Sequence, residues 1–285
     1  MDVYDQTEEF LTLLRARRTP GSLTTRRRWR VERGRLRRAR PSDGDHTDQL
    51  TAIRAALAVA APQAVVGFQT AAELLGFGVL PSGEIHLVVP AGAPVPQRRG
   101  IRAHQSVVPV GEPVSVRGIP CTPAARCAID LARTVARLDA LPILDAALRS
   151  GACDADHLGT ELAAHDGLRG IRQVRPLVEL ADPRPRCRQE SQLRLILHDG
   201  GIRGFEPGLP VTDQNGVARH VIGLGHTELR VGLEYAGEPV DRARQVWLEG
   251  QGWRMCYFTD RDIDSGVAGV IGPVVAALRS RRGRE

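Results

Sequence analysis

The sequence predicts an α/β protein, in the broad α+β sense, with two domains behind a basic N-terminal arm. Its 285 residues suffice for about two domains of average size. Hydrophobic residues make up 42% of the chain and charged residues 25%, which excludes collagen-like, disulfide-scaffold and wholly disordered classes. Helix and strand patterns alternate over residues 46–181 and 182–285, and the prolines of segment 182–186 mark the boundary between them.

The arm, residues 1–45, carries a dense run of positive charge. Residues 15–40 hold twelve arginines and one acid, Glu32, whereas the whole chain has a net charge of +6. The chain has no lysine, and arginine is the better residue for bidentate phosphate and guanine contacts, although a GC-rich genome also favours arginine codons. A basic element on a near-neutral body is typical of nucleic-acid binding. The alternative interpretation of the arm is a solvated, partly disordered segment.

We expect the arm to contact duplex DNA. Single-strand and RNA readers depend on stacking platforms, but aromatic residues are only 4% of the chain and the arginine-rich stretch holds one, Trp29. A helix with arginines on nearly every face can follow a phosphate backbone or enter a groove. The predicted DNA-binding residues are Arg26, Arg27, Arg28, Arg30, Arg33, Arg35, Arg37 and Arg38.

The middle segment alternates helices and strands after a linker over residues 41–48. We expect a helix capped by Thr47 or Asp48 and ended by Pro62, then one with a Thr70/Glu73 capping box closed by Gly76. A strand over 84–90 and one or two strands within 101–119 follow. A helix capped by Thr122, with Pro123 first, precedes helices over 138–181 that break near Gly151, Gly167 and Pro176.

The last hundred residues have the predicted order α-β-β-β-α-β-α. An amphipathic helix carries Leu193, Ile196 and Leu197 on one side. The expected strands cover 209–212, 217–224, 229–235 and 253–258, with helices over 240–250 and from 262 onward. Asn215 and Gly216 form a hairpin signal between the first two strands.

This order, with the strings RQESQLRLIL, ELRVGLEYAG and GWRMCYFTDRDI, resembles the very-short-patch-repair-type branch of the PD-(D/E)XK nucleases over residues 183–265. The resemblance implies a restriction-endonuclease-like αβββαβ fold. In active members, strand-borne carboxylates hold Mg²⁺ against the scissile phosphate. Glu190 and Glu234 match the family's helix and third-strand glutamates and are the candidate catalytic residues.

Two other positions of the family's motif are vacant in this sequence. Gly223 stands where the second strand has an aspartate, and Ala236 stands where a second charged residue follows the glutamate. We therefore expect a degenerate site with no metal and no cofactor, Mg²⁺ being required only if the nuclease alternative holds. His220 and His226 flank Gly223, but lone histidines at strand ends are more often surface or capping groups.

The cysteines and apolar segments point to a cytoplasmic protein without a membrane span. The five cysteines form no CxxC pair, which favours reduced thiols and argues against a zinc site. Cys127 lies in an apolar helix and is expected in the core. No apolar run is long enough to cross a bilayer, and the N-terminus lacks a signal core.

The strings GFQTAAELLGF, IHLVVP, GIRAHQS and GIPCTPAARCAIDLAR make residues 50–150 resemble AbiEi-type antitoxins. The resemblance implies an N-terminal winged helix that binds DNA and represses its own operon, and a toxin partner. The string TTRRRWRVERGRLRRARP then looks like the end of the recognition helix and the wing, with Gly34 at the turn. Residues 1–45 would thus be a remnant winged helix.

The combined prediction is a non-catalytic DNA-binding protein, either a transcriptional regulator or an antitoxin-like protein. Duplex DNA and a toxin protein are the expected partners, and a homodimer is left open. One alternative is a Mg²⁺-dependent DNA endonuclease that uses Glu190 and Glu234. Another is a protein-interaction scaffold whose arm is incidental. Gly223 and Ala236 argue against the enzyme, and the clustered arginines argue against a pure scaffold.

Overall fold

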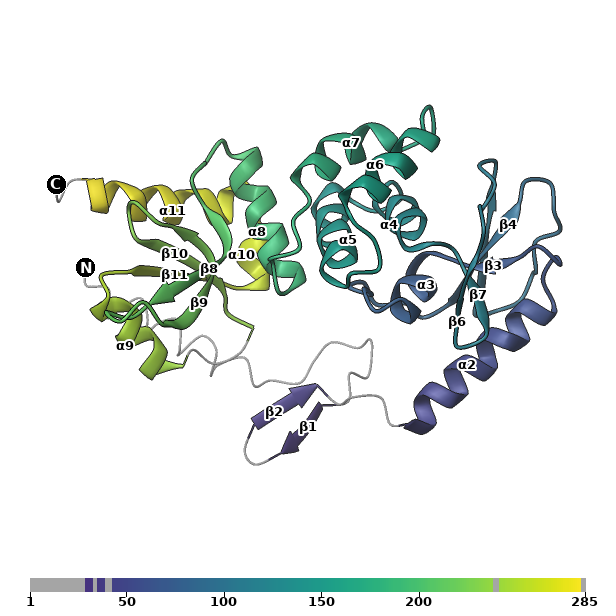
Figure 1. The fold of residues 1–285 in the computed structure, drawn as a ribbon, viewed down its shortest axis with the longest axis horizontal. Helices are drawn as coiled ribbons and strands as arrows, with labels where there is room; N and C mark the ends of the chain where they lie inside the picture. Colours follow the sequence, from purple (N-terminus) through teal and green to yellow (C-terminus); the bar gives the residue numbers. More distant parts are fainter. Residues whose placement is uncertain (1–28, 33–34, 39–42, 238–240, 283–285) are drawn as a thin grey trace. The chain divides into compact units, whose positions relative to one another are not determined.

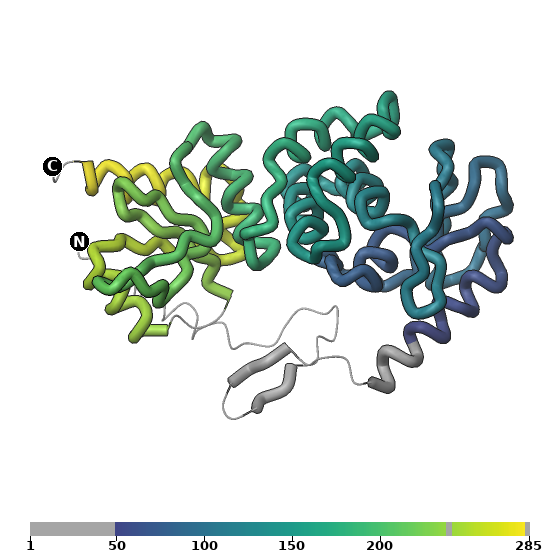
Figure 2. The backbone as a smooth tube through the Cα atoms, in the orientation of Figure 1, coloured from purple at the N-terminus to yellow at the C-terminus, as the bar shows by residue number. Residues whose placement is uncertain are grey.

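The computed structural model describes residues 29–32, 35–38, 43–237 and 241–282, with side chains from residue 49 onward. The chain divides into two units, Met1–Leu50 and Thr51–Glu285. Figures 1 and 2 trace both units along the chain. Within the described residues, no helix is long and apolar enough to cross a membrane.

The first unit contains a two-stranded antiparallel hairpin. Its strands are β1 (Trp29–Glu32) and β2 (Arg35–Arg38), with Trp29 opposite Arg38 and Glu32 opposite Arg35. The hairpin lies where the sequence predicts a wing. The expectation of an arginine-bearing helix is wrong for these residues, because bulky and β-branched residues such as Trp29 and Val31 favour an extended strand.

The second unit begins with a mixed sheet covered by helices (Figure 1). Its strands are β3 (Val65–Val66), β4 (Ile85–Pro90), β5 (Ile101–Ser106), β6 (Val114–Val116) and β7 (Ile119–Cys121). Their order is β5-β4-β3-β7-β6, with β4/β5 and β3/β7 parallel and the other pairs antiparallel. Helix α2 (Asp43–Ala58) contains the boundary between the two units. The other helices of this part are α3 (Phe68–Leu74), α4 (Ala124–Ala132), α5 (Arg137–Arg149), α6 (Ala155–Ala164) and α7 (Ile171–Leu180).

Several predicted helix boundaries in this part are wrong. Helix α2 already begins at Asp43, so most of the expected linker is helical. Thr70 does not cap α3, because its hydroxyl is buried and accepts a hydrogen bond from the backbone N of His86 at 2.9 Å. Pro123, rather than Thr122, is the N-cap of α4.

Pro176 lies inside α7 and does not break it. Proline removes one backbone hydrogen bond from a helix. The apolar face of α7, formed by Ile171, Val174 and Leu177, is buried on both sides of the proline, and this packing keeps the helix continuous. The predicted breaks near Gly151 and Gly167 are confirmed, since both have a positive φ between helices.

The remaining part of the second unit is a four-stranded mixed sheet between helices. Its strands are β8 (Glu206–Thr212), β9 (Ala218–His226), β10 (Val231–Tyr235) and β11 (Arg254–Phe258), and its helices are α8 (Arg188–Asp199), α9 (Arg242–Gly250), α10 (Asp260–Asp264) and α11 (Val267–Arg282). The strand order is β11-β10-β9-β8, and only β10 and β11 are parallel. The predicted order of elements is confirmed up to the last strand, and the single last helix that we expect is divided into α10 and α11. We call residues 182–282 the tail and residues 63–181 the body.

Two apolar clusters cover opposite faces of the tail sheet. On one face, Leu193 of α8 and Val274 of α11 pack with Leu224 and Leu233 of the sheet. On the other face, Leu248 of α9 joins Ile222, Trp253 and Val211. The tail therefore has three layers, with α8 and α11 on one side and α9 on the other (Figure 1).

Body and tail meet through α5 and α8. A guanidinium nitrogen of Arg194 in α8 lies 2.8 Å from both carboxylate oxygens of Asp145 in α5. Asp145 is fully buried and also accepts the backbone N–H of Asp182 at 2.8 Å. A second ion pair joins Arg188 of α8 to Asp139 of α5 at 2.5 Å. These charged contacts cross the boundary that the prolines predict.

Candidate functional site

Glu190 is a buried carboxylate at the start of α8. It is 5% exposed, and its Oε2 accepts the backbone N–H of Arg186 at 2.7 Å. The Arg186 guanidinium donates to Oε1 at 3.0 Å. A charge at this depth requires a partner and hydrogen bonds, and Arg186 provides both.

The vacant strand position lies directly beside this carboxylate. A Cβ built on Gly223 of β9 would lie 2.9 Å from Glu190 Oε1 and 3.2 Å from the Leu233 carbonyl oxygen. The structure therefore brings Gly223 and Glu190 together, which the sequence could only infer by counting residues back from Glu234.

Glu234 of β10 is paired with a different arginine. Arg244, in the first turn of α9, donates to Glu234 Oε2 at 2.6 Å and also to Oε1. The same guanidinium donates to the Val221 carbonyl at 2.8 Å. Both carboxylate oxygens of Glu234 are therefore occupied by one cation, which belongs to the protein.

Tyr257 lies beside Glu234 in the register of β10 and β11. Its hydroxyl is buried and has no hydrogen-bond partner among the described residues. Burial, together with the negative charge of Glu234, raises the pKa of Tyr257. The hydroxyl therefore stays protonated and can neither ligate a metal as a phenolate nor accept a proton at neutral pH.

Ala236 is held at the end of β10 by its backbone N–H, which donates to the Phe258 carbonyl at 2.8 Å. It is buried and has no ligand atom in its side chain. Within the described residues, no group of three or more His, Cys, Asp or Glu side chains is placed to hold a metal ion. The site contains two carboxylates, each neutralised by its own arginine.

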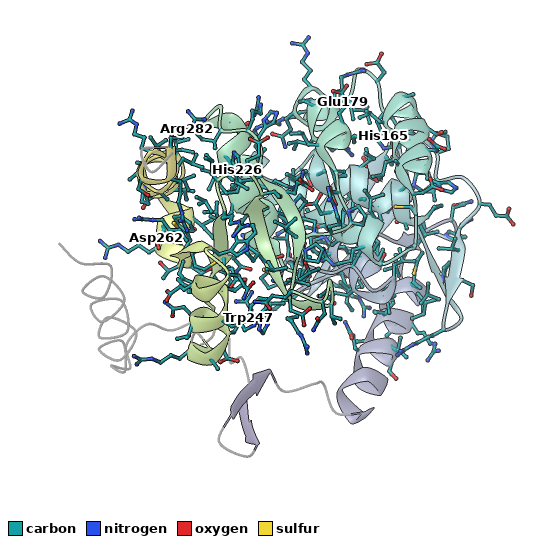
Figure 3. The ribbon with its side chains drawn as sticks, turned by 60° about the vertical axis from the view of Figure 1, so that its left-hand side comes forward. His165, Glu179, His226, Trp247, Asp262 and Arg282 are labelled. Carbon is teal, nitrogen blue, oxygen red and sulfur yellow. The ribbon has the colours of Figure 1, made fainter. Side chains whose placement is uncertain are left out.

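The two histidines near Gly223 make aromatic contacts. His226 meets the ring of Phe205 edge-on at 5.4 Å, and its Nδ1 accepts the Leu229 N–H at 3.4 Å. His220 meets the ring of Trp247 at 5.0 Å. His226 and Trp247 are labelled in Figure 3. His226 is buried and accepts a backbone N–H as a capping group would, whereas His220 is half-buried, so neither is an exposed surface group.

A buried charge network in the body has no counterpart among the predictions. Arg126 of α4 donates to Asp130 at 2.6 Å and to Ser106 Oγ at 2.7 Å. It also bonds to the Pro109 carbonyl at 3.1 Å, so that it ties the loop after β5 to α4. The buried His165, the C-cap residue of α6, lies 3.4 Å from Asp130.

This network keeps the Asp130 carboxylate ionised. Burial raises the pKa of Asp130, but hydrogen bonds from His165 and Arg126 and the nearby positive charges outweigh burial and lower it to about 2. The signal in the sequence was an arginine and an aspartate four residues apart on an otherwise apolar helix, since such a pair on a buried face must be internally compensated.

The predicted DNA-binding arginines divide into two groups. Arg30 lies in β1, and Arg35, Arg37 and Arg38 lie in β2, where Arg30 pairs with Arg37 in the strand register. The other predicted contacts, Arg26, Arg27, Arg28 and Arg33, lie outside the described residues. Half of the predicted set is therefore placed on one short hairpin.

Comparison with known proteins gives a match over the body. Residues 63–180 match the family model described as the AbiEi antitoxin C-terminal domain. Over 199 residues the chain is 33% identical to Uncharacterized protein MT2308 and to Uncharacterized protein Rv2248, from two strains of Mycobacterium tuberculosis. Each alignment covers 67% of this chain and 72% of the relative.

A solved structure, the crystal structure of RV2827C protein from Mycobacterium tuberculosis, aligns at 15% identity with a TM-score of 0.32. The alignment covers 57% of this chain and 60% of that chain, so this chain spans less than two thirds of that protein. A TM-score this low supports no conclusion about the fold.

Proposed function

Because this chain belongs to the family of Uncharacterized protein Rv2248 and contains an AbiEi antitoxin C-terminal domain at residues 63–180, we propose that it is an antitoxin-like DNA-binding protein. In this proposal it regulates transcription, and its tail has a nuclease-like fold that does not cut DNA. A toxin protein is the expected protein partner, in line with the family.

The arm supports the DNA-binding part of the proposal. A two-stranded ribbon fits the major groove of duplex DNA, and a wing can follow the backbone beside it. The strands of the hairpin include four arginine positions: Arg30, Arg35, Arg37 and Arg38. Arginines on a small element can neutralise several phosphates at once, which gives affinity that falls steeply with salt.

The pairing of Glu234 with Arg244 is the observation that carries the non-catalytic part. A metal-dependent nuclease needs free carboxylate oxygens for Mg²⁺, but both oxygens of Glu234 accept hydrogen bonds from Arg244. The neighbouring ligand positions hold Gly223 and Ala236. A positive guanidinium here also repels a divalent cation.

DNA binding is tested with the full chain and a mixed-sequence duplex at several salt concentrations. Replacing Arg26, Arg27, Arg28 and Arg30 by alanine should flatten the plot of log K against log salt by about 3 to 4, since each phosphate contact contributes about 0.9. An unchanged slope would place the contacts elsewhere. A wild-type chain that binds no duplex would contradict the proposed function and favour the scaffold alternative.

Cleavage is tested by incubating the full chain with plasmid and Mg²⁺ or Mn²⁺. We expect no nicking by the wild type or by Glu234→Ala. Cutting by the wild type that disappears in Glu234→Ala would establish the endonuclease alternative. Cutting that persists in Glu234→Ala would indicate a contaminating nuclease.

A further inference from the structure

We propose that the tail carries a second surface for the phosphates of duplex DNA, separate from the arm and from the nuclease-like site. This inference rests on the proposed DNA-binding function and adds a contact region to it. The surface consists of five arginines at one end of the tail, which we call the tail arginine surface. Its members are Arg230, Arg254, Arg279, Arg281 and Arg282.

Hydrogen bonds to one turn bring two of these arginines together from different elements. Arg230 precedes β10, and its Nη1 donates to the Gln251 carbonyl at 2.9 Å. Arg281, in the last turn of α11, donates to the carbonyl of the next residue, Gly252. Both guanidiniums are therefore held at the turn that follows α9.

The other three arginines adjoin the same end of α11. Arg254 begins β11, and its Nη1 donates to Ser280 Oγ of α11 at 3.0 Å. Arg279 and Arg282 are exposed in the last turn of this helix. Figure 3 labels Arg282. Guanidiniums from the turn before β10, from strand β11 and from helix α11 thus converge on one end of the tail.

The backbone at Arg230 is arranged to place its side chain. Arg230 has φ +47°, a left-handed conformation that glycine or asparagine adopts at lower cost. Opposite it, Gly252 has φ +82°, and a Cβ there would lie 3.1 Å from Arg230 Nη1. Gly252 therefore leaves room for the Arg230 guanidinium. Residue 230 is an arginine although its backbone conformation is unfavourable for one.

Most of these arginines form no ion pair with a carboxylate of the described residues. Many arginines elsewhere in the chain form ion pairs, including Arg126, Arg194 and Arg244. Among the ion pairs of the described residues, none involves Arg230, Arg254, Arg279 or Arg282. Arg230 uses only one of its N–H groups in its bond to Gln251.

Interactions with the negative C-terminal ends of nearby helices do not offset all the positive charge of the tail arginine surface. The ends of α9 and α11 each correspond to about half a negative charge. Glu228 and Glu249 are near in sequence, and they remove two more positive charges. After these negative contributions, the tail arginine surface keeps a net charge of about +2, which attracts an anion.

Phosphate is the anion that this geometry favours. A guanidinium presents its donors in a planar fork that matches two oxygens of a phosphate. Arg279 and Arg282 lie three residues apart on a helix, so their side chains project from one face. Several such groups in one region suit the repeated phosphates of a duplex backbone better than an isolated anion.

The experiment measures binding of the full chain to a mixed-sequence DNA duplex against salt. The test variant combines Arg230→Gln, Arg279→Gln and Arg282→Gln. The matched control combines Arg98→Gln, Arg169→Gln and Arg172→Gln, which removes the same charge from exposed positions of the body. We expect the tail variant to flatten the log K against log salt slope by about 2 to 3 and the control to leave it nearly unchanged.

Each outcome decides the proposal. A tail variant with the wild-type slope, in a chain that binds duplex, overturns the tail surface and leaves the proposed function intact. Equal losses in both triple variants also overturn it, because they would reflect net charge alone. Absence of duplex binding by the wild type overturns the proposed function itself. Circular dichroism of each variant establishes that it is folded.

Discussion

Body and tail both bury charged side chains, but the two sets of charges differ in their surroundings. In the body, Arg126 and Asp130 are enclosed by further donors and acceptors that fix a loop to a helix. In the tail, Glu190 and Glu234 each have one arginine, and the small residue Gly223 adjoins Glu190. A buried ion pair therefore does not by itself mark a functional site. A carboxylate that lies beside a glycine, as Glu190 lies beside Gly223, is a more informative sign of a functional site than an ion pair.

The body network should show the largest effect on stability. Asp130→Ala removes the buried carboxylate that Arg126 contacts at 2.6 Å and that lies 3.4 Å from His165. Glu161, 3.8 Å from Arg126 and less deeply buried, replaces it only in part. Removing one partner of a buried pair leaves an uncompensated charge and costs about 3–5 kcal/mol. Urea unfolding of the full chain, followed by circular dichroism, measures the loss.

The control for this prediction is Asp166→Ala. Asp166 pairs with Arg175 at 2.6 Å, and both side chains are well exposed. An exposed pair contributes at most about 1 kcal/mol. Equal losses of stability in Asp130→Ala and Asp166→Ala would mean that the body network is not stabilised as a closed unit.

The tail should respond next most strongly when the vacant positions are filled. Gly223→Asp places a Cβ 2.9 Å from Glu190 Oε1 and adds a like charge beside it. Crowding and repulsion should together cost about 1–3 kcal/mol in the absence of divalent cations. Combining it with Ala236→Asp supplies oxygen ligands on two strands, which is the donor set that Mg²⁺ and Mn²⁺ require.

Mn²⁺ then separates two interpretations of the tail. If the backbone keeps the geometry of a metal site, Mn²⁺ should raise the melting temperature of the double variant and leave the wild type unchanged. A folded double variant with no calorimetric Mn²⁺ binding would indicate that the strands no longer have that geometry. Gly225→Asp is a matched control on the same strand, because its Cβ would meet Leu209 instead of a carboxylate.

The sequence predicted the tail better than it predicted the body. Each tail strand is long enough to show its apolar pattern, and Asn215-Gly216 marked the hairpin between β8 and β9. In the body, β6 and β7 have three residues each, which is too short for any periodicity to be read. Thr70 was misassigned for a different reason, since its contact with His86 depends on a strand distant in sequence.

The sequence predicted which residues belong to the candidate site, but it did not predict the contacts that they make. Glu190, Gly223 and Glu234 could be located through the resemblance to the nuclease family, but the arginine partners of the two glutamates could not. Arg244 reaches Glu234 of strand β10 from helix α9, and a contact between a strand and a helix cannot be read from their spacing in the sequence. The body network was missed because Arg126 and Asp130 sit in a helix that otherwise reads as apolar.

The smallest expected effect concerns the pH dependence of body stability. His86 Nδ1 lies 3.0 Å from His104 Nε2, and Phe68 stacks on His104 with ring centroids 3.8 Å apart. Burial, followed by the nearby His86 and Arg102, lowers the pKa of His104 to about 4. Burial also lowers the pKa of His86. The folded body therefore favours the neutral pair, in which one ring donates to the other.

The direction of the pH effect follows from proton binding. A histidine in the unfolded chain has a pKa of about 6.5, so the unfolded state binds more protons than the folded state at lower pH. The stabilising contribution of the neutral histidine pair is fully present above pH 6.5 and is lost as the pH falls toward 4.

His104→Gln should flatten the dependence of the urea midpoint on pH between about 6.5 and 4. His220→Gln is the control, because His220 lies in the tail and forms no ion pair among the described residues. If His104→Gln has the same pH dependence as the wild type, the acid sensitivity of the body arises from groups other than this pair.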